Sequence, residues 1–344
     1  MRSHVSAFGP GRVNLIGEHT DYNEGLALPF AISDGVTVRA SAREDRRIEA
    51  VAKDLGEHDS FDLGGVEGAD GWRAFVRGAA GELERLGVSL SGAELAIAGT
   101  VPQGSGLSSS AALEVALVLA LLSVSDAAEP DRLELAKLCS RIENDWVGAQ
   151  TGLLDQIASL CGSTDRALLI DFQTLDVQPV ALELRDYGLV TLDSGEQHTH
   201  AGSGYNQRRA ECAEAASRLG VDSLRDATLG MAEGLDEPLS RRARHVITEN
   251  QRVRAAVAAL EQRDMDELGR LLAASHASLR DCYEISTPAV EDAVARCKQA
   301  GAVGARIMGG GFGGSVLALF PPGAVPPDGS VEVRPGAGAR VGAE

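Results

Sequence analysis

Lysine is almost absent from this sequence, where it occurs only at Lys53, Lys137 and Lys298. Acidic side chains outnumber basic ones by 50 to 32, which gives a formal net charge of -18 at pH 7. A surface this negative repels the phosphates of nucleic acids and anionic lipid headgroups. The composition therefore argues against nucleic-acid and membrane partners, and it leaves few lysines for any phosphate-binding scheme.

Paired cysteines and long apolar segments are also lacking. The five cysteines are widely spaced and form no Cys-x-x-Cys pair, which argues against a disulfide framework or a zinc site. The longest apolar run, residues 115–122, is far shorter than the roughly 20 residues that span a bilayer. No charged segment followed by a long apolar stretch opens the chain. We therefore expect a cytoplasmic protein with reduced thiols.

The length of 344 residues is enough for two packed lobes. Short β-branched runs between turn residues predict a mostly β segment over residues 3–63. Apolar periodicity and helix-ending residues predict helices further along, at 74–86, 111–122, 131–147, 205–219, 239–261, 265–279 and 287–300. Strands are expected at 95–98, 167–172, 189–192, 305–308 and 315–320. This alternation indicates an α+β protein rather than a doubly wound parallel sheet.

A segment of small residues at 101–110, Val-Pro-Gln-Gly-Ser-Gly-Leu-Ser-Ser-Ser, lies between a predicted strand and a predicted helix. Small residues let the backbone approach a ligand, and the N-terminus of the following helix favours an anion. A nucleotide phosphate fits this position, and one serine could present its hydroxyl to Mg²⁺; the alternative is a plain glycine turn. The segment lacks the Gly-Lys-Ser/Thr ending of a Walker A loop. Backbone amides, Mg²⁺ and arginine would therefore have to neutralise the phosphates.

A second polar segment occupies residues 11–23 and brings together Arg12, Glu18, His19 and Asp21. Carboxylates and imidazole suit sugar hydroxyls, which need both donors and acceptors. The alternative is a solvated polar loop.

A third segment places Glu143 twelve residues before Asp155, with Gly148 and Gly152 between them. Phosphoryl transfer needs metal ligands and a carboxylate that orients or deprotonates the acceptor hydroxyl. Glu143 could hold Mg²⁺ and Asp155 could be that carboxylate. On spacing alone, a solvated glutamate and a helix-capping aspartate explain the pair better.

Glycine dominates a fourth segment, Gly-Gly-Gly-Phe-Gly-Gly at 309–314, between two predicted strands. So many glycines permit close backbone approach but cost chain entropy, which suggests that something must fit there. A flexible hairpin connection is the alternative.

Together these segments resemble the signature motifs of the GHMP small-molecule kinases, and residues 11–23 resemble the signature of the galactokinase family within them. The resemblance extends through Gly-Leu-Leu-Asp-Gln at 152–156, Tyr205, Thr-Glu-Asn at 248–250 and Ser-His-Ala-Ser-Leu-Arg-Asp at 275–281. Recognisable pattern thus covers residues 8–320, which is most of the chain.

The resemblance implies a two-lobed GHMP kinase fold with the active site in the cleft between the lobes. Residues 1–175 would form an N-terminal lobe with a left-handed βαβ unit, and residues 176–344 a ferredoxin-like C-terminal lobe. The implied reaction transfers the γ-phosphoryl group of ATP to the C1 hydroxyl of α-D-galactose, with Mg²⁺ as cofactor. We expect a monomer, with a weak dimer as the alternative, and small molecules as the only partners.

The resemblance also implies roles for individual residues. The sugar contacts would be Arg12, Glu18, His19, Asp21, Gly152, Asp155 and Tyr205. The ATP-binding residues would be Gly104, Ser105, Gly106, Leu107, Ser108, Ser109 and Ser110, and the Mg²⁺ ligands would be Ser110 and Glu143. Asp155 would be the catalytic carboxylate with Arg12 beside it, because a nearby cation keeps a carboxylate ionised and stabilises charge on the transferring phosphoryl group. The same cation weakens Asp155 as a base, so deprotonation and orientation of the hydroxyl both stay open.

Two alternatives to a galactose kinase stay open at this stage. A related kinase could act on N-acetylgalactosamine, arabinose or another hexose, because the same glutamate, histidine and aspartate can bind several sugars. A regulatory protein could bind galactose and ATP without catalysis, although such relatives lack part of the Ser-Ser-Ser-Ala-Ala stretch that is intact here at 108–112.

Overall fold

Strand β1 (His4–Asn14) opens the chain and pairs antiparallel with β3 (Pro29–Arg43), in a computed structural model that describes residues 4–101, 106–196 and 201–342. The two strands form the centre of a sheet with the order β13-β1-β3-β6-β4-β5. Its other members are β4 (Arg47–Ala52), β5 (Glu57–Asp62), β6 (Gly92–Gly99) and β13 (Arg340–Gly342). Only the β4–β6 pair is parallel among these strands. The mostly β opening predicted for residues 3–63 is confirmed over the described residues.

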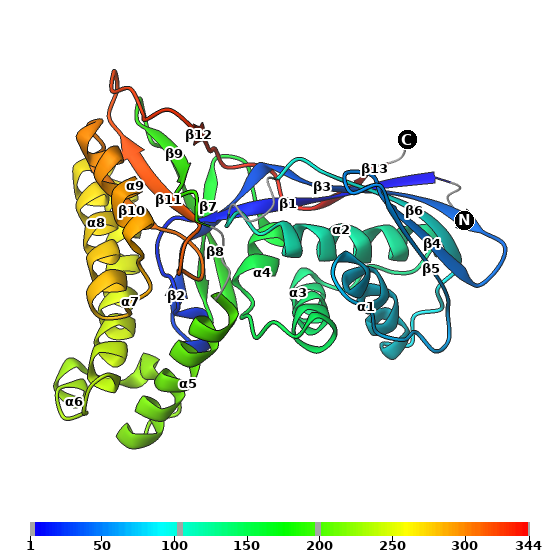
Figure 1. The fold of residues 1–344 in the computed structure, drawn as a ribbon, viewed down its shortest axis with the longest axis horizontal. Helices are drawn as coiled ribbons and strands as arrows, with labels where there is room; N and C mark the ends of the chain where they lie inside the picture. Colours follow the sequence, from blue (N-terminus) through cyan, green and yellow to red (C-terminus); the bar gives the residue numbers. More distant parts are fainter. Residues whose placement is uncertain (1–3, 102–105, 197–200, 343–344) are drawn as a thin grey trace.

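Helices cover one face of this sheet (Figure 1). They are α1 (Trp72–Arg85), α2 (Ser109–Val124), α3 (Arg132–Arg141) and α4 (Leu154–Cys161). Helix α2 is apolar nearly all round because it packs between the sheet and the other helices, and its residues 115–122 are all buried. The predicted central position of this helix is confirmed.

The helix predicted over residues 131–147 is present in two parts. Asp131 caps α3 by accepting hydrogen bonds from the N–H groups of Leu133 and Glu134. Beyond Arg141 the chain continues as a π-helix, η2 (Ile142–Val147), which ends at Gly148. Such wide turns are frequent at functional sites because they displace side chains from the helical register. Here the displaced turn carries Glu143.

The chain forms two more sheets, one from strands of the second half and one that combines strands of both halves. A four-stranded antiparallel sheet has the order β10-β11-β9-β12, from β9 (Gly188–Asp193), β10 (Gly304–Ile307), β11 (Ser315–Phe320) and β12 (Ser330–Glu332). A three-stranded sheet joins β2 (Leu26–Ala27) with β7 (Arg166–Asp171) and β8 (Asp176–Ala181).

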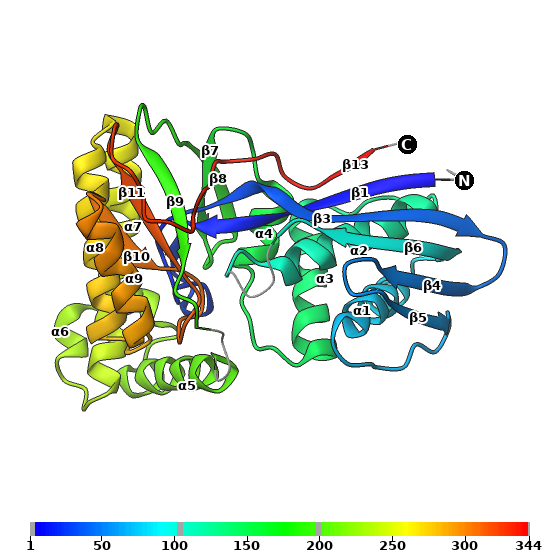
Figure 2. The ribbon, with the colours of Figure 1, turned by 45° about the horizontal axis from the view of Figure 1, so that its top comes forward.

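Most helices of the second half gather beside the four-stranded sheet (Figure 2). The helices of this half are α5 (Ala201–Leu219), α6 (Leu229–Ala232), α7 (Leu239–Gln262), α8 (Met265–Asp281) and α9 (Pro288–Gln299), with the short 3₁₀ turn η3 (Leu224–Asp226). Another 3₁₀ turn, η1 (Asp21–Asn23), lies in the first half, after β1. Helix α9 begins as its sequence predicts, with Thr287 as N-cap and Pro288 in the first turn. Helices α8 and α9 pack on β10, and α7 packs on α8.

One hydrophobic cluster joins the two halves of the molecule. It combines Val13 and Phe30 from the first sheet with Val253 of α7, Leu272 of α8 and Leu317 of β11. Because the cluster is continuous, the polar turn that follows β1 lies directly against the helices of the second half. This packing determines where the site forms.

The predicted elements are all present, with ends shifted by a few residues, and the α+β fold class is confirmed. Strand β8 was missed because it is mostly exposed, and β12 and β13 because each is only three residues long. The boundary at residue 175 stays a prediction: β8 pairs with β7 just before it, and β13 from the C-terminal end pairs with β1. None of the helices in the described part of the chain combines the length and apolar character that a bilayer crossing requires.

Candidate active site

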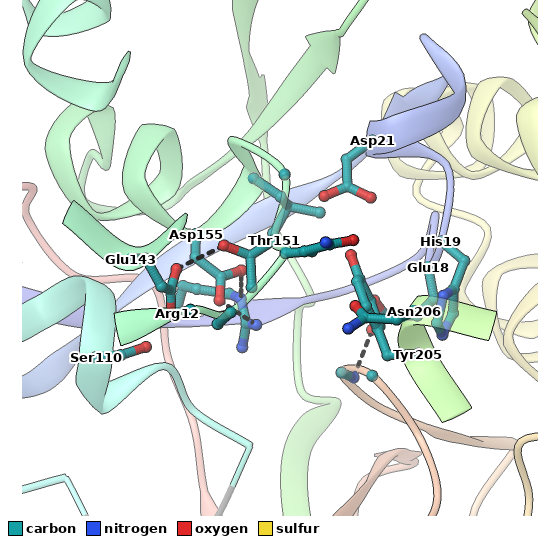
Figure 3. A pocket seen from close by; sticks show the side chains of 17 residues that line it. Arg12, Glu18, His19, Asp21, Ser110, Glu143, Thr151, Asp155, Tyr205 and Asn206 are labelled. Carbon is teal, nitrogen blue, oxygen red and sulfur yellow. Dashed lines mark hydrogen bonds and ion pairs between the residues drawn. The ribbon is translucent and has the colours of Figure 1, made fainter. Parts of the chain in front are cut away.

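A cavity of about 440 Å³ lies where β1, α4, α5 and the glycine run meet (Figure 3). Its size is typical of sites for small molecules. Side chains from both halves of the chain line it, namely Arg12, Glu18, His19, Asp21, Ser110, Glu143, Gln150, Thr151, Leu154, Asp155, Tyr205 and Asn206, together with the backbone of Gly148, Ala149, Gly152, Gly309 and Gly310. Figure 3 shows Arg12, Asp155 and Glu143 on one side and Glu18, His19 and Tyr205 on the other.

Arg12 and Asp155 form a bidentate ion pair on one side of the cavity. Arg12 Nε donates to Asp155 Oδ1 at 2.6 Å and Nη2 donates to Oδ2 at 2.7 Å. A register shift in the β1–β3 pair between Pro10 and Arg12 interrupts the ladder at this point, and such bulges re-aim side chains next to active sites. Asp155 lies in the first turn of α4, and it binds Arg12 instead of capping that helix.

The chain around Gly106 completes the surroundings of this pair. Arg12 Nη1 donates to the Gly106 carbonyl at 2.6 Å, and the Ser108 hydroxyl donates to Asp155 Oδ2. Burial by itself lowers the pKa of Arg12, but the charges of Asp155 and Glu18 outweigh it and raise that pKa. Arg12 is therefore positively charged at physiological pH.

The polar turn after β1 forms the opposite side of the cavity. Glu18 accepts a hydrogen bond from the Gly309 N–H at 2.9 Å and pairs with the buried Arg306, whose Nη2 is 3.2 Å away. His19 Nδ1 and the Tyr22 hydroxyl are 2.7 Å apart, and burial lowers the pKa of His19 to about 3. Burial also raises the pKa of Asp21 to about 6. At neutral pH the turn thus presents a neutral imidazole and carboxylates.

Gly152 approaches Asp21 so closely that no side chain could replace its hydrogen. A Cβ built on Gly152 would overlap the Asp21 carboxylate, with Cγ only 2.6 Å away. Real Cβ atoms do not come this close to other heavy atoms, so the Asp21 side chain would have to rotate or one of the two segments would have to move. Glycine at position 152 therefore allows the loop before α4 and the polar turn to meet.

Tyr205 of α5 lies across the cavity from Arg12, next to His19 and the glycine run. Its ring centroid is 5.2 Å from that of His19, and a Cβ on Gly310 would lie 3.3 Å from the Tyr205 ring. Burial raises the pKa of Tyr205 well above its usual range. The hydroxyl is therefore a neutral donor and acceptor at physiological pH.

Glu143 is a buried carboxylate without a cationic partner among the described residues. Its Oε2 accepts hydrogen bonds from Thr151 Oγ1 at 2.7 Å and from Gln156 Nε2 at 2.9 Å. Burial and then the charge of Asp155 raise the pKa of Glu143. A carboxylate in this position favours a bound cation.

The residues that the sequence singled out for the sugar and the metal all line this one cavity. Of the described residues that were predicted to bind ATP, only Ser110 lines this cavity. Gly104 and Ser105 lie outside the described residues, Leu107 packs into the core, and Ser109 begins α2. The sequence missed Gln150, Thr151 and Asn206, which also line the cavity. No local pattern marks them, although each stands within a few residues of a predicted one.

Models of known families match three parts of the chain. Residues 74–163 match the GHMP kinases N terminal domain, and residues 256–327 match GHMP kinases C terminal. Residues 2–42 match the galactokinase galactose-binding signature. A mevalonate kinase structure from Methanococcus jannaschii, 16% identical, superposes over 98% of this chain and 99% of its own with a TM-score of 0.70. Fold and family models thus define a GHMP kinase.

Proteins with higher sequence identity to this chain identify the family within the GHMP kinases. Galactokinase from Mycobacterium tuberculosis is 45% identical over 324 residues, which are 92% of this chain and 89% of the relative. Galactokinase from Roseiflexus sp. is 42% identical over 335 residues, covering 93% and 84%. The structure of Lactococcus lactis galactokinase complexed with galactose is 36% identical, with a TM-score of 0.90 over 98% of this chain and 95% of that one. The chain belongs to the galactokinase family, and it is an ATP-dependent sugar kinase.

Proposed function

We propose that this chain transfers the γ-phosphoryl group of ATP to the C1 hydroxyl of α-D-galactose, which yields galactose 1-phosphate and ADP. The observation that carries this proposal is the convergence of the polar turn and the Arg12–Asp155 pair on one cavity. The relative from Lactococcus lactis, whose structure is described as complexed with galactose, supports galactose as the sugar.

The sugar would lie between the polar turn, Gly152 and Tyr205. Glu18 and Asp21 offer acceptors to sugar hydroxyls, and the neutral His19 and Tyr205 can donate or accept. Each sugar hydroxyl both donates and accepts, so this mixture satisfies several of them at once.

Arg12 and Asp155 would act on the hydroxyl that reacts. In the reaction the C1 oxygen forms a bond to the γ-phosphorus, the bond from that phosphorus to the bridging oxygen breaks, and ADP leaves with the electron pair. Asp155 accepts a hydrogen bond from the attacking hydroxyl and takes up its proton as the new bond forms. Arg12 keeps Asp155 oriented and supplies positive charge beside the transferring group, where charge stabilisation is most effective.

ATP would place its phosphates at the N-terminus of α2. Ser108 is the N-cap residue of this helix, yet its hydroxyl bonds to Asp155 and makes no cap. The N–H groups of the first turn therefore stay available for an anion, and the helix dipole favours negative charge there. The same turn carries Ser109 and Ser110, and Ser110 lines the cavity.

Ser110 and Glu143 suit a magnesium ion bound together with nucleotide phosphates. Magnesium sites in kinases use one or two carboxylates, phosphate oxygens and water. The described residues contain no cluster of three or more histidine, cysteine or acidic side chains that could bind a metal unaided. When bound here, the ion would neutralise the charge of the phosphates, since the chain has few lysines that could do so. Glu143 and Ser110 would supply its protein ligands.

A sugar panel tests the proposal. Purified protein is incubated with ATP, Mg²⁺ and, separately, galactose, N-acetylgalactosamine, arabinose and glucose, and ADP release is followed. We expect galactose to give the highest kcat/KM. Turnover of another sugar without turnover of galactose would contradict the substrate, and binding of galactose and ATP without ADP release would indicate a regulator. Light scattering on the same sample tests the predicted monomer.

A further inference from the structure

Two motifs of the second half do not line the cavity, although both are buried. They are Thr-Glu-Asn at 248–250 on α7 and the stretch that begins at Ser275 on α8. His245 and Glu249 are neighbours on one face of α7 because they are four positions apart, and Asn250 follows Glu249. All three side chains are at least 96% buried, with His245 and Glu249 completely inaccessible. Buried polar groups at such depth need partners.

Their partners are backbone atoms of the polar turn. His245 Nε2 lies 3.1 Å from the Glu18 carbonyl oxygen. Glu249 Oε1 accepts a hydrogen bond from the Gly17 N–H at 3.1 Å, and Asn250 Oδ1 accepts one from the Leu26 N–H at 2.8 Å. Three side chains of one helix thus bond to both ends of the turn that carries the cavity side chains.

A second layer holds this helix face in place. Ser275 of α8 donates to Glu249 Oε1 at 2.6 Å, and Arg252 Nε donates to Glu249 Oε2 at 2.6 Å. Burial alone would raise the pKa of Glu249, but Arg252, His245 and Arg306 lower it to about 2. Glu249 is therefore an ionised, fully buried acceptor, which makes charge-assisted hydrogen bonds.

The same layer determines the hydrogen-bonding direction of His245. Its Nε2 faces a carbonyl, which can only accept, so Nε2 carries the proton and donates to Glu18. Nδ1 must then accept from the Ser278 hydroxyl, 2.8 Å away. Burial lowers the pKa of His245 to about 4, so this neutral tautomer persists at physiological pH.

The turn packs closely on itself and against α7. Gly17 has φ +98, and a Cβ there would lie 2.5 Å from the Leu26 carbonyl oxygen. A Cβ on Gly25 would lie 2.6 Å from Asn250 Oδ1. The turn is thus closed on itself and pressed against the helix, so a change on α7 is transmitted to the backbone of the turn.

We propose that His245, Glu249 and Asn250 are positioning residues that set the affinity for the sugar by holding the backbone of residues 17–26. The inference rests on the proposed function, in which Glu18, His19 and Asp21 of this turn bind the sugar. Replacement of Glu249 by glutamine removes the charge that strengthens the hydrogen bond from the Gly17 N–H, and it places a new NH₂ donor among groups that themselves donate to this side chain, so the turn is held less firmly. Side chains displaced by even 1 Å hold their ligand less well. Among the described residues, no hydrogen bond or ion pair joins these three side chains to the nucleotide side of the cavity, so we expect nucleotide binding to change little.

The variant Glu249→Gln tests this inference against Glu261→Gln as a matched control. Both substitutions remove one carboxylate from α7, but Glu261 is exposed near the end of the helix. We expect Glu249→Gln to raise the KM for galactose about tenfold while the KM for ATP changes less than twofold, and Glu261→Gln to match the parent protein. Calorimetric titration with galactose in the absence of ATP measures the same loss directly.

The possible results distinguish this inference from a general loosening of the structure and from a failure of the proposed function. A folded Glu249→Gln variant with an unchanged galactose KM overturns it, and so does an equal rise in both KM values, which would indicate general loosening. If Glu249→Gln does not fold, Ser275→Ala removes only one hydrogen bond from Glu249; an increase of about threefold in galactose KM is expected, and no increase overturns the inference. Absence of galactose turnover in the parent protein would instead contradict the proposed function.

Discussion

The guanidinium of Arg12 binds the carboxylate of Asp155 through two parallel hydrogen bonds of 2.6 and 2.7 Å, although the residues are 143 positions apart in the chain. Arg12 comes from the first strand and Asp155 from the first turn of α4. The pair forms the side of the cavity next to Ser108, Ser110 and Glu143. A kinase needs a carboxylate and a cation at the reacting oxygen, and this arrangement supplies both.

Replacement of Asp155 by asparagine should abolish phosphorylation while galactose binding persists. The amide keeps the shape of the side chain but cannot take up the proton, and it leaves Arg12 without its counter-charge. We expect kcat to fall by about 10³-fold or more, because proton transfer and charge placement are both lost. Coupled ADP release measures turnover and calorimetry measures galactose binding. Retained turnover would remove Asp155 from the mechanism.

Replacement of Gly152 by alanine should weaken sugar binding through Asp21. The added methyl group overlaps the Asp21 carboxylate, so the Asp21 side chain must leave its position or the loop before α4 must move. We expect the galactose KM to rise about tenfold or more with a smaller effect on the KM for ATP. Gly230→Ala is the control, since a Cβ at Gly230 meets no atom within 4 Å. Equal behaviour of the two variants would show that the fit at Gly152 does not matter.

Replacement of Glu143 by glutamine should raise the Mg²⁺ concentration that activity requires without lowering the stability of the protein. Burial raises the pKa of Glu143, so its ionised form costs folding free energy, and an amide of the same shape should leave the melting temperature equal or higher. The Mg²⁺ concentration for half-maximal activity should rise at least about tenfold, because one protein ligand is lost. Ser110→Ala should have the same effect to a smaller degree. An unchanged Mg²⁺ dependence of both variants would place the metal elsewhere.

Asp21 should make the stability of the unliganded protein depend on pH. Burial raises its pKa from 3.8 to about 6, so between these values the folded protein binds more protons than the unfolded chain, and stability falls as pH rises. The Asp21→Asn substitution removes this loss of stability, because asparagine does not titrate. The variant should gain stability relative to the parent between pH 4 and pH 8, by at most about 3 kcal/mol at about 1.4 kcal/mol per pKa unit.

Denaturant unfolding across that pH range measures the difference. Asp222→Asn, which changes an exposed aspartate, is the matched control. A constant difference between Asp21→Asn and the parent protein at all pH values would contradict a raised pKa of Asp21.

The helices and strands could be predicted from the sequence because their signals are local. Apolar residues at helical spacing defined the buried α2, and the Thr-Pro start of α9 defined its first turn. The short exposed strands β12 and β13 carry no comparable signal, since their pairing depends on β9 and β1. The π-turn of Glu143 was also missed, because periodicity does not distinguish a widened turn from an α-helix.

The sequence by itself determined the class of protein and the residue types of the site. The polar turn, the serine-rich segment and the segment from Glu143 to Asp155 each lie in a short stretch of chain, so their joint resemblance to the GHMP kinase motifs can be recognised without coordinates. Only the tertiary structure decided which residues support them. Gly17 and Glu249 are 232 positions apart, and they meet because a shared hydrophobic cluster packs the first sheet against α7. Contacts of this kind depend on the packing of both halves at once, and no local pattern of residues encodes them.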